Sequence, residues 1–220
     1  TLDGAAAVEA LQDAAIVERN HLKDDRAAVA LLERANAIHP DWFSLRLLRE
    51  LHYRSQDWSS LVEVLATMST LSSGPRAARC KVEEGRIREV ELRDDDGASQ
   101  AYDEALRHDP TYMDAFLARI RVAKAVGDQD ALVALYQRHA DSVKGHNRQF
   151  WLEAAARVAG AAGHDAAGAL YRAAIAGNNG SGSSLHREAA AYFARHDNAD
   201  GVHEAQTAEA KHQSGVARAS

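Results

Sequence analysis

The sequence predicts an all-α fold in which about six antiparallel helix hairpins follow one another as an α-solenoid. Three observations lead to this prediction: one amphipathic helix with clear ends, the return of its pattern at a nearly fixed spacing, and the lack of any convincing alternating strand segment. The composition agrees, since only 3 prolines and 4 phenylalanines occur among 220 residues. The hydrophobic fraction of 46% and the charged fraction of 26% are ordinary for a soluble protein.

The helix that sets the pattern begins near Ala98 and ends before Pro110. A small residue, an aromatic residue and an Ala-Leu pair follow at helical spacings, which places four side chains on one face. These are Ala98, Tyr102, Ala105 and Leu106. Aspartates at 94–96 can cap the free backbone N–H groups at its start. The segment therefore has both the face and the ends of a packed helix.

The same pattern returns along the chain. Its first position recurs at spacings of 33, 37, 34, 35 and 34, at Ala28, Leu61, Ala98, Leu132, Ala167 and Gly201. Six copies at such regular spacing indicate a repeat protein. Because the aromatic position is tyrosine three times, we expect Tyr102, Tyr136 and Tyr171 to occupy equivalent, largely buried places.

This arrangement resembles the tetratricopeptide repeat (TPR) family, whose repeat is about 34 residues long. The resemblance covers nearly the whole chain and is strongest in the third and fourth repeats. The family's large residue early in the first helix is matched by Phe116 and Trp151, and its mid-helix glycine has Gly85 as the nearest candidate. The closing proline is present only at Pro40 and Pro110, so a related helical-hairpin solenoid accounts for the degenerate repeats equally well. The resemblance implies a right-handed, TPR-like superhelix.

One solenoid is expected over residues 1–213, with a frayed tail at 214–220. The approximate repeats are 5–40, 41–74, 75–110, 111–146, 147–180 and 181–213. Turn residues predict loops at 69–75 and 177–184, of which the second is the longest flexible connection. One hairpin cannot bury its apolar face alone, so the stacking of hairpins is expected to create the core.

The charge pattern disfavours a nucleic-acid partner, because the net charge of −6 is spread along the chain and no basic stripe occurs. No apolar run approaches the roughly 18 residues of a membrane span. The sequence shows neither a signal peptide nor an initiator Met, so upstream sequence can have been removed. The single cysteine, Cys80, leaves the compartment open, with the cytoplasm favoured over the periplasm.

No motif for catalysis or cofactor binding is found. The 11 histidines suggest a metal, but no pair has HExxH spacing. The GxSxG, Walker and GxGxxG motifs are also absent. Helix capping explains the aspartates at 94–96 better than a cation site does. We therefore predict a protein that is not an enzyme, with no catalytic residue, metal or cofactor. His139 stands where the other repeats carry mostly small residues, and a hydrogen-bonded core histidine is expected there.

The remaining candidate site is a surface. In the TPR family, the first helix of each hairpin lines a concave groove that receives an extended peptide or a partner's helix. The resemblance implies that this groove carries Phe43, Arg46, Glu50, Tyr53, Arg54, Glu83, Glu84, Ile87, Asp114, Arg121 and Lys124. Aromatic and arginine side chains supply binding energy in such surfaces, while opposed charges set register. The plainer interpretation is that these residues are solvated helix faces.

The function that this pattern favours is a non-catalytic scaffold or adaptor that binds a protein or peptide partner in the groove. Two alternatives stay open: an accessory repeat domain of a larger enzyme or secretion or assembly machine, and a sensor for a peptide or lipid. A homo-oligomer also stays open. The Lys/Asn set with which some family members clamp a C-terminal carboxylate is not reproduced, so that ligand is not predicted.

Overall fold

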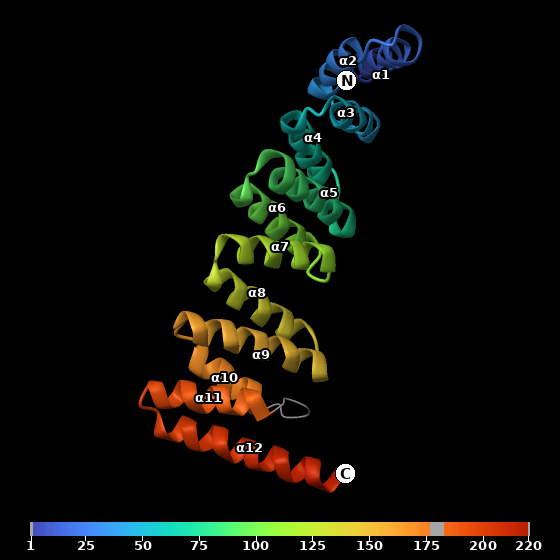
Figure 1. Cartoon of the computed structure of the whole chain (residues 1–220). Coiled ribbons are helices and arrows are strands. Elements are labelled where there is room, and N and C mark those ends of the chain that lie inside the picture. The colour runs from blue at the N-terminus through green and yellow to red at the C-terminus, as the bar shows by residue number, and fades with distance from the viewer. Residues whose placement is uncertain (1, 177–182, 220) are drawn as a thin grey trace. The chain divides into compact units, whose positions relative to one another are not determined.

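The computed structural model describes residues 2–176 and 183–219, and all regular structure within them is helical. These residues form twelve α-helices and two π-helical turns, which confirms the all-α prediction. Most helices pack in antiparallel orientation against the helix that follows them in the chain (Figure 1). The chain divides into two compact units, Thr1–Val122 and Ala123–Ser220, here called the N-terminal and C-terminal units. The boundary lies inside helix α7 (Met113–Val126).

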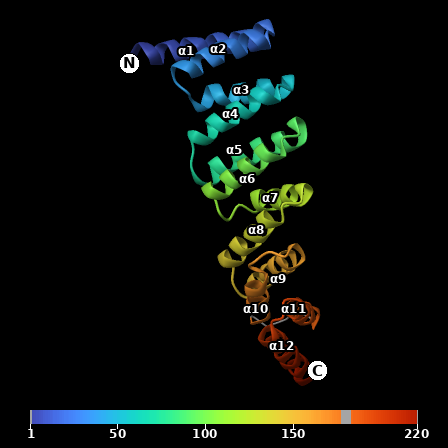
Figure 2. The ribbon, with the colours of Figure 1, turned by 90° about the vertical axis from the view of Figure 1, so that its left-hand side faces the viewer.

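The N-terminal unit contains three complete hairpins, α1/α2, α3/α4 and α5/α6, which Figure 2 shows in succession. Its elements are α1 (Leu2–Val17), η1 (Glu18–Leu22), α2 (Asp25–Ile38), α3 (Trp42–Ser55), α4 (Trp58–Thr70), α5 (Gly74–Ile87), η2 (Arg88–Leu92), α6 (Asp95–His108) and the first part of α7. The C-terminal unit contains the rest of α7, α8 (Gln129–Ser142), α9 (Gly145–Ala162), α10 (Ala167–Ala176), α11 (Ser183–Arg195) and α12 (Ala199–Ala219). Within it, α9 packs on α8 and α10, and α12 packs on α11 and α10.

One turn type recurs between the helices of a hairpin. The residue two positions before the second helix adopts a left-handed conformation, as at Lys23, Gln56, Arg93 and Gly127. The aspartate that follows caps the second helix by accepting a hydrogen bond from the backbone N–H three residues on, as Asp24, Asp57, Asp94 and Asp128 do. The expected capping role is therefore confirmed for Asp94, and Asp24, Asp57 and Asp128 cap their helices in the same way. Such a cap typically contributes about 1 kcal/mol.

The long spacing of 37 residues has a different origin from the one predicted. We expected a loop at 69–75 to hold the additional residues, but α4 continues to Thr70, and α5 begins at Gly74 with Pro75 in its first turn. Proline is tolerated there because the first N–H groups of a helix have no intrahelical partner. The additional length lies in the first helix of the third hairpin, since α5 has 14 residues and η2 adds 5, whereas α3 has 14 in all.

Two further boundaries bear on the sequence prediction. Helix α12 continues to Ala219, beyond the end near His212 that the sequence suggested. The connection expected at 177–184 lies mostly outside the described residues, and α11 begins at Ser183. The division into six repeats at the stated residues, with a tail at 214–220, stays a prediction.

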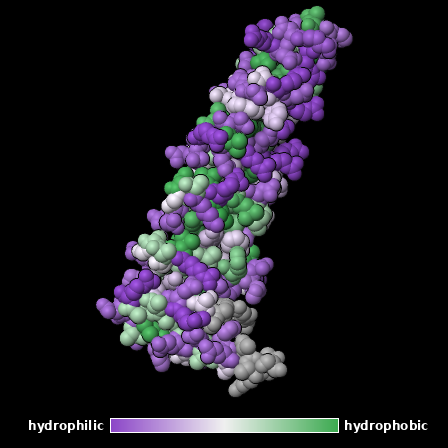
Figure 3. All heavy atoms as spheres, viewed as in Figure 1, coloured by the Kyte–Doolittle hydropathy of each residue, from purple (hydrophilic) through white to green (hydrophobic). Residues whose placement is uncertain are grey.

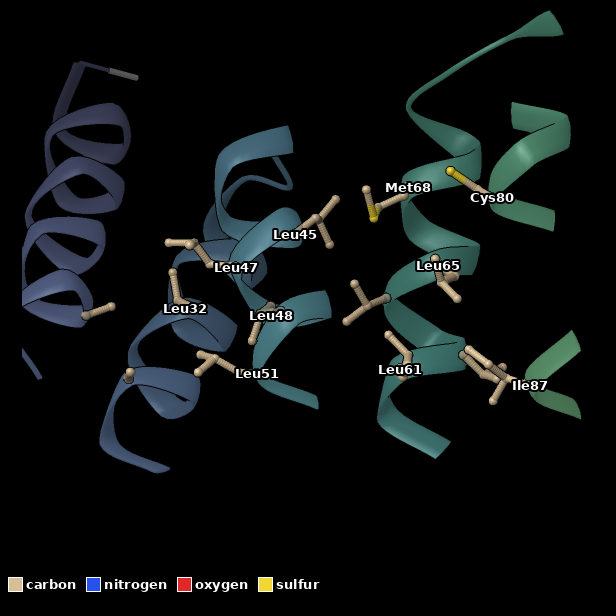
Figure 4. Close-up of a cluster of buried hydrophobic side chains, with 14 residues drawn as sticks. Leu32, Leu45, Leu47, Leu48, Leu51, Leu61, Leu65, Met68, Cys80 and Ile87 are labelled. Atoms are coloured by element: carbon tan, nitrogen blue, oxygen red, sulfur yellow. The ribbon is translucent and has the colours of Figure 1, made fainter. Parts of the chain in front are cut away.

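The core of the N-terminal unit joins neighbouring hairpins. Figure 4 shows Leu32 of α2 beside Leu48 and Leu51 of α3, with Leu65 of α4 and Cys80 of α5 in the same cluster. Full burial of one leucine contributes about 1.5–3 kcal/mol. Because the cluster draws on five successive helices, α1 to α5, the stacking of hairpins creates the core, as the sequence predicted.

The three repeated tyrosines are buried: the exposed fractions of Tyr102, Tyr136 and Tyr171 are 0%, 6% and 5%. Two of them pack on a glycine in the preceding helix. A Cβ at Gly85 would lie 2.5 Å from Cε1 of Tyr102, and one at Gly160 would lie 2.7 Å from the hydroxyl of Tyr171. The expected burial is confirmed. Gly85 is a mid-helix glycine required by close packing. Gly160 has the same role but was not predicted from the sequence.

His139 is half-buried, and its ring packs edge-on against Trp151, with ring centroids 4.9 Å apart. Burial lowers the pKa of this histidine. His139 follows the capping Asp128 by the same number of residues as Ala105 follows Asp94, so it occupies the assigned position. The residue beside it, Ala140, is fully buried.

Candidate partner-binding trough

Two adjoining hollows form a trough over the first helices of the N-terminal unit. One, of about 660 Å³, is lined by residues of η1, α3 and α5. The other, of about 500 Å³, is lined by the end of α3, the start of α4, α5, η2 and the start of α7. The two hollows share Arg49, Tyr53 and Glu83, so they form one continuous surface.

Contacts between α3 and α5 fix how the two helices align along the trough. Near their N-terminal ends, the guanidinium of Arg76 lies over the ring of Trp42, 5.3 Å from its centroid. In the middle of the helices, Arg49 forms an ion pair with Glu83 at 2.7 Å. Both contacts join residues 34 apart, so α3 and α5 run in parallel and equivalent positions lie side by side.

Ion pairs also join the other first helices of this unit. Arg19 of η1 pairs with Glu50 of α3 at 3.5 Å, and Arg121 of α7 pairs with Glu89 of η2 at 2.7 Å. In the C-terminal unit, equivalent pairs one repeat apart are Arg157–Glu188 and Arg172–Glu204, both at 2.8 Å. Exposed pairs of this kind contribute at most about 1 kcal/mol each, but they favour one register between repeats. These ion pairs were not predicted from the sequence, although each joins an arginine and a glutamate about one repeat apart.

The C-terminal edge of α3 and α5 is aromatic and apolar. Tyr53 is 63% exposed and packs edge-on against Trp58, with ring centroids 5.6 Å apart. Val90 of η2 is also exposed and lines the same hollow, with Ile87 and Val82 buried beneath it. The face in Figure 3 is mostly hydrophilic, with hydrophobic residues in small groups. The apolar edge that Tyr53 and Val90 form can receive one or two apolar side chains of a partner.

The structure brings together only some of the residues assigned to the groove. Those that line the hollows are Arg46, Glu50, Tyr53, Glu83, Ile87 and Asp114. Phe43 and Arg54 are exposed but line neither hollow, and Arg54 extends to Asp25 of α2 at 3.1 Å. Arg121 is held by Glu89, and Lys124 is an exposed residue of the C-terminal unit.

Glu84 lies in the interior of the third hairpin rather than in the trough. Its carboxylate accepts hydrogen bonds from Lys81 at 2.8 Å and from Arg88 at 3.1 Å. Lys81 also contacts Glu104 at 2.7 Å, and Arg88 contacts Asp94 at 2.8 Å. Burial alone would lower the pKa of Lys81, but its hydrogen bonds with Glu104 and Glu84 raise it above the ordinary value. The network ties α5, η2 and α6 together, so Glu84 has a structural role.

Glu89 also stabilises this hairpin, and its contribution should depend on pH. Arg121 donates two hydrogen bonds to its carboxylate, and the Tyr102 hydroxyl donates a third at 2.8 Å. The hydrogen bonds from Arg121 lower the pKa of Glu89, against the opposing effect of burial. A carboxyl group whose pKa is lowered on folding stabilises the fold fully above its unfolded value of about 4.3, and this stabilisation is lost as pH falls through the folded value.

We therefore expect Glu89→Gln to lower the free energy of unfolding by about 1 kcal/mol near neutral pH. The difference from wild type should shrink as the wild-type glutamate becomes protonated below its folded pKa. Urea unfolding of both proteins between neutral and acidic pH measures this difference. A difference that stays constant over the whole range would contradict the ionic role of Glu89.

Neither a metal-holding cluster nor a membrane-spanning helix is found among the described residues. In these residues, no group of three or more His, Cys, Asp or Glu side chains is placed to hold a metal ion. Among the same residues, no helix is long and apolar enough to cross a membrane.

Comparison with known proteins finds similarity at the level of solved structures. No family model matches the chain, and no curated protein matches it. The crystal structure of PilW, described as a widely conserved type IV pilus biogenesis factor, is 16% identical over 91% of this chain and 90% of that chain, with a TM-score of 0.37. A tetratricopeptide repeat protein from Parabacteroides merdae is 14% identical over 92% of this chain and 78% of that chain, with a TM-score of 0.40.

The succession of antiparallel hairpins, the capped turns and the tyrosines packed on mid-helix glycines define the class of this chain. It is an all-α helical-repeat protein built of successive antiparallel helix hairpins.

Proposed function

We propose that this chain is a non-catalytic interaction scaffold, and that the trough of its N-terminal unit binds a segment of a partner protein. The observation that carries the proposal is the pair of adjoining hollows with the exposed Tyr53 at their junction. Exposed aromatic and arginine side chains in a concave site are the residues that most often anchor a partner.

The helices beneath the trough support a preorganised site. The contacts Trp42–Arg76, Arg49–Glu83 and Arg19–Glu50 hold α3 against its neighbours on both sides. A surface that is rigid before binding loses less conformational entropy when a partner docks. The lining favours a protein segment over a lipid, because charged side chains line both hollows.

The test is a selection from a displayed library of random peptides against the whole chain, followed by titration of the selected segments. We expect Tyr53→Ala to weaken their binding at least about thirtyfold, equivalent to about 2 kcal/mol, because it removes a central anchor. The fold should remain intact, since Tyr53 is largely exposed. A thermal melt of each variant checks this.

Phe150→Ala is the matched control, because Phe150 is another exposed aromatic residue, 61% accessible, in the C-terminal unit. It should leave binding unchanged. Failure to select any segment, or selected segments that bind Tyr53→Ala as tightly as wild type, would overturn the proposed site.

A further inference from the structure

Two arginines in the trough lack a counter-charge. Arg46 of α3 and Arg79 of α5 line the hollows, and within the described residues neither forms an ion pair or a side-chain hydrogen bond. The nearby acids are engaged elsewhere, because Glu50 pairs with Arg19 and Glu83 pairs with Arg49.

Arg46 and Arg79 lie at similar levels of α3 and α5 but line different hollows of the trough. Arg46 lies between Trp42 and Arg49 on α3, and Arg79 lies between Arg76 and Glu83 on α5. The contacts Trp42–Arg76 and Arg49–Glu83 therefore bracket them on both sides. An acidic segment that crosses both hollows can meet one unpaired arginine in each of them.

The two edges of the trough differ in chemistry. Arg46 and Arg79 lie in the N-terminal halves of their helices, whereas Tyr53 and Val90 lie at the C-terminal ends. A partner segment that crosses α3 and α5 would meet cations along one side and an aromatic, apolar surface along the other. Arginine suits the cationic side, because its planar guanidinium binds carboxylates in a bidentate manner.

We propose, on the basis of the binding function above, that the trough recognises a segment with two carboxylate side chains and a bulky apolar side chain. The carboxylates bind Arg46 and Arg79, and the apolar side chain packs on Tyr53 and Val90.

Charge also argues against a continuous polyanion such as nucleic acid. Glu91 and Asp114 line the trough beyond the arginine pair, and the chain carries a net charge of −6. A phosphate backbone would meet these acids as well as the arginines, whereas a protein segment can place its carboxylates at the arginine pair alone.

A charge-reversal experiment tests the proposal. The probes are a peptide selected as above, its form with the paired acids changed to glutamine, its form with them changed to lysine, and a short oligothymidylate. They are titrated against wild type, against the double variant Arg46→Glu/Arg79→Glu, and against Arg34→Glu. The last is the matched control, because Arg34 is an exposed arginine on α2 that lines neither hollow of the trough.

We expect the selected peptides to carry paired acids, and the change to glutamine to weaken wild-type binding at least about tenfold, or about 1.4 kcal/mol. The double variant should prefer the lysine peptide, and Arg34→Glu should behave as wild type. Binding that needs Tyr53 but tolerates the double charge reversal would overturn this inference and leave the proposed function standing. Binding that does not need Tyr53 would overturn both. Tight binding of the oligothymidylate that depends on both arginines would replace the protein segment with a polyanion.

Discussion

Glu84→Gln is expected to lower the free energy of unfolding by about 3 kcal/mol, because removing one member of a buried ion pair leaves its partners uncompensated. The side chain of Glu84 is only 6% exposed, and that of Lys81 only 12%. The expected loss lies at the lower end of the usual range because Lys81 keeps Glu104 and Arg88 keeps Asp94. Urea denaturation near neutral pH measures the effect.

Glu104→Gln is the matched control, since Glu104 pairs with the same lysine at 2.7 Å but its side chain is 39% exposed. Its loss should be about 1 kcal/mol or less. Equal losses in the two variants would show that Lys81 needs a carboxylate on either side, and that the burial of Glu84 adds nothing.

Glu84 also shows how far the sequence could predict the site. Adjacent residues on a helix point about 100° apart, so Glu83 and Glu84 cannot share one environment. The sequence assigned both to the groove, but Glu83 lines it whereas Glu84 faces Lys81 and Arg88 inside the hairpin. Repeat register locates equivalent positions, as the three buried tyrosines show, but not the direction in which each surface side chain points. The rotation of each helix depends on packing, which the period alone does not determine.

The hairpins themselves were predictable because their signals are local and recur. Small residues, tyrosines and capping aspartates return at about the repeat length, and the helices follow them. The π-helical turns were not predictable in this way, since the 37-residue spacing showed extra length but not its place. Turn residues at 69–75 suggested that a loop holds the additional residues. They lie instead in the following helix, which continues through η2 to Leu92. The hydrogen bond from Asp94 N–H to the carbonyl of Arg88, at 2.8 Å, closes that wider turn.

Gly85→Ala is expected to lower the free energy of unfolding by about 1–3 kcal/mol, the usual cost of overpacking a core. In most helices this change stabilises the fold by about 1 kcal/mol, so the sign of the effect is itself informative. The new Cβ would lie 2.5 Å from Cε1 of Tyr102. The tyrosine cannot easily move away, because its ring is fully buried and its hydroxyl donates a hydrogen bond to Glu89.

Gly168→Ala in α10 is the matched control, because the nearest side-chain atom to its Cβ would be Cε1 of Phe193 at 3.6 Å, an ordinary contact. It should leave stability unchanged or raise it by up to about 1 kcal/mol. In a Tyr102→Leu background, the cost of Gly85→Ala should largely disappear, since the ring that it meets is gone. Denaturant midpoints of the four proteins in this cycle measure the coupling. If Gly85→Ala raised the midpoint in the wild-type background, the close packing of Tyr102 on Gly85 would not be what keeps glycine at this position.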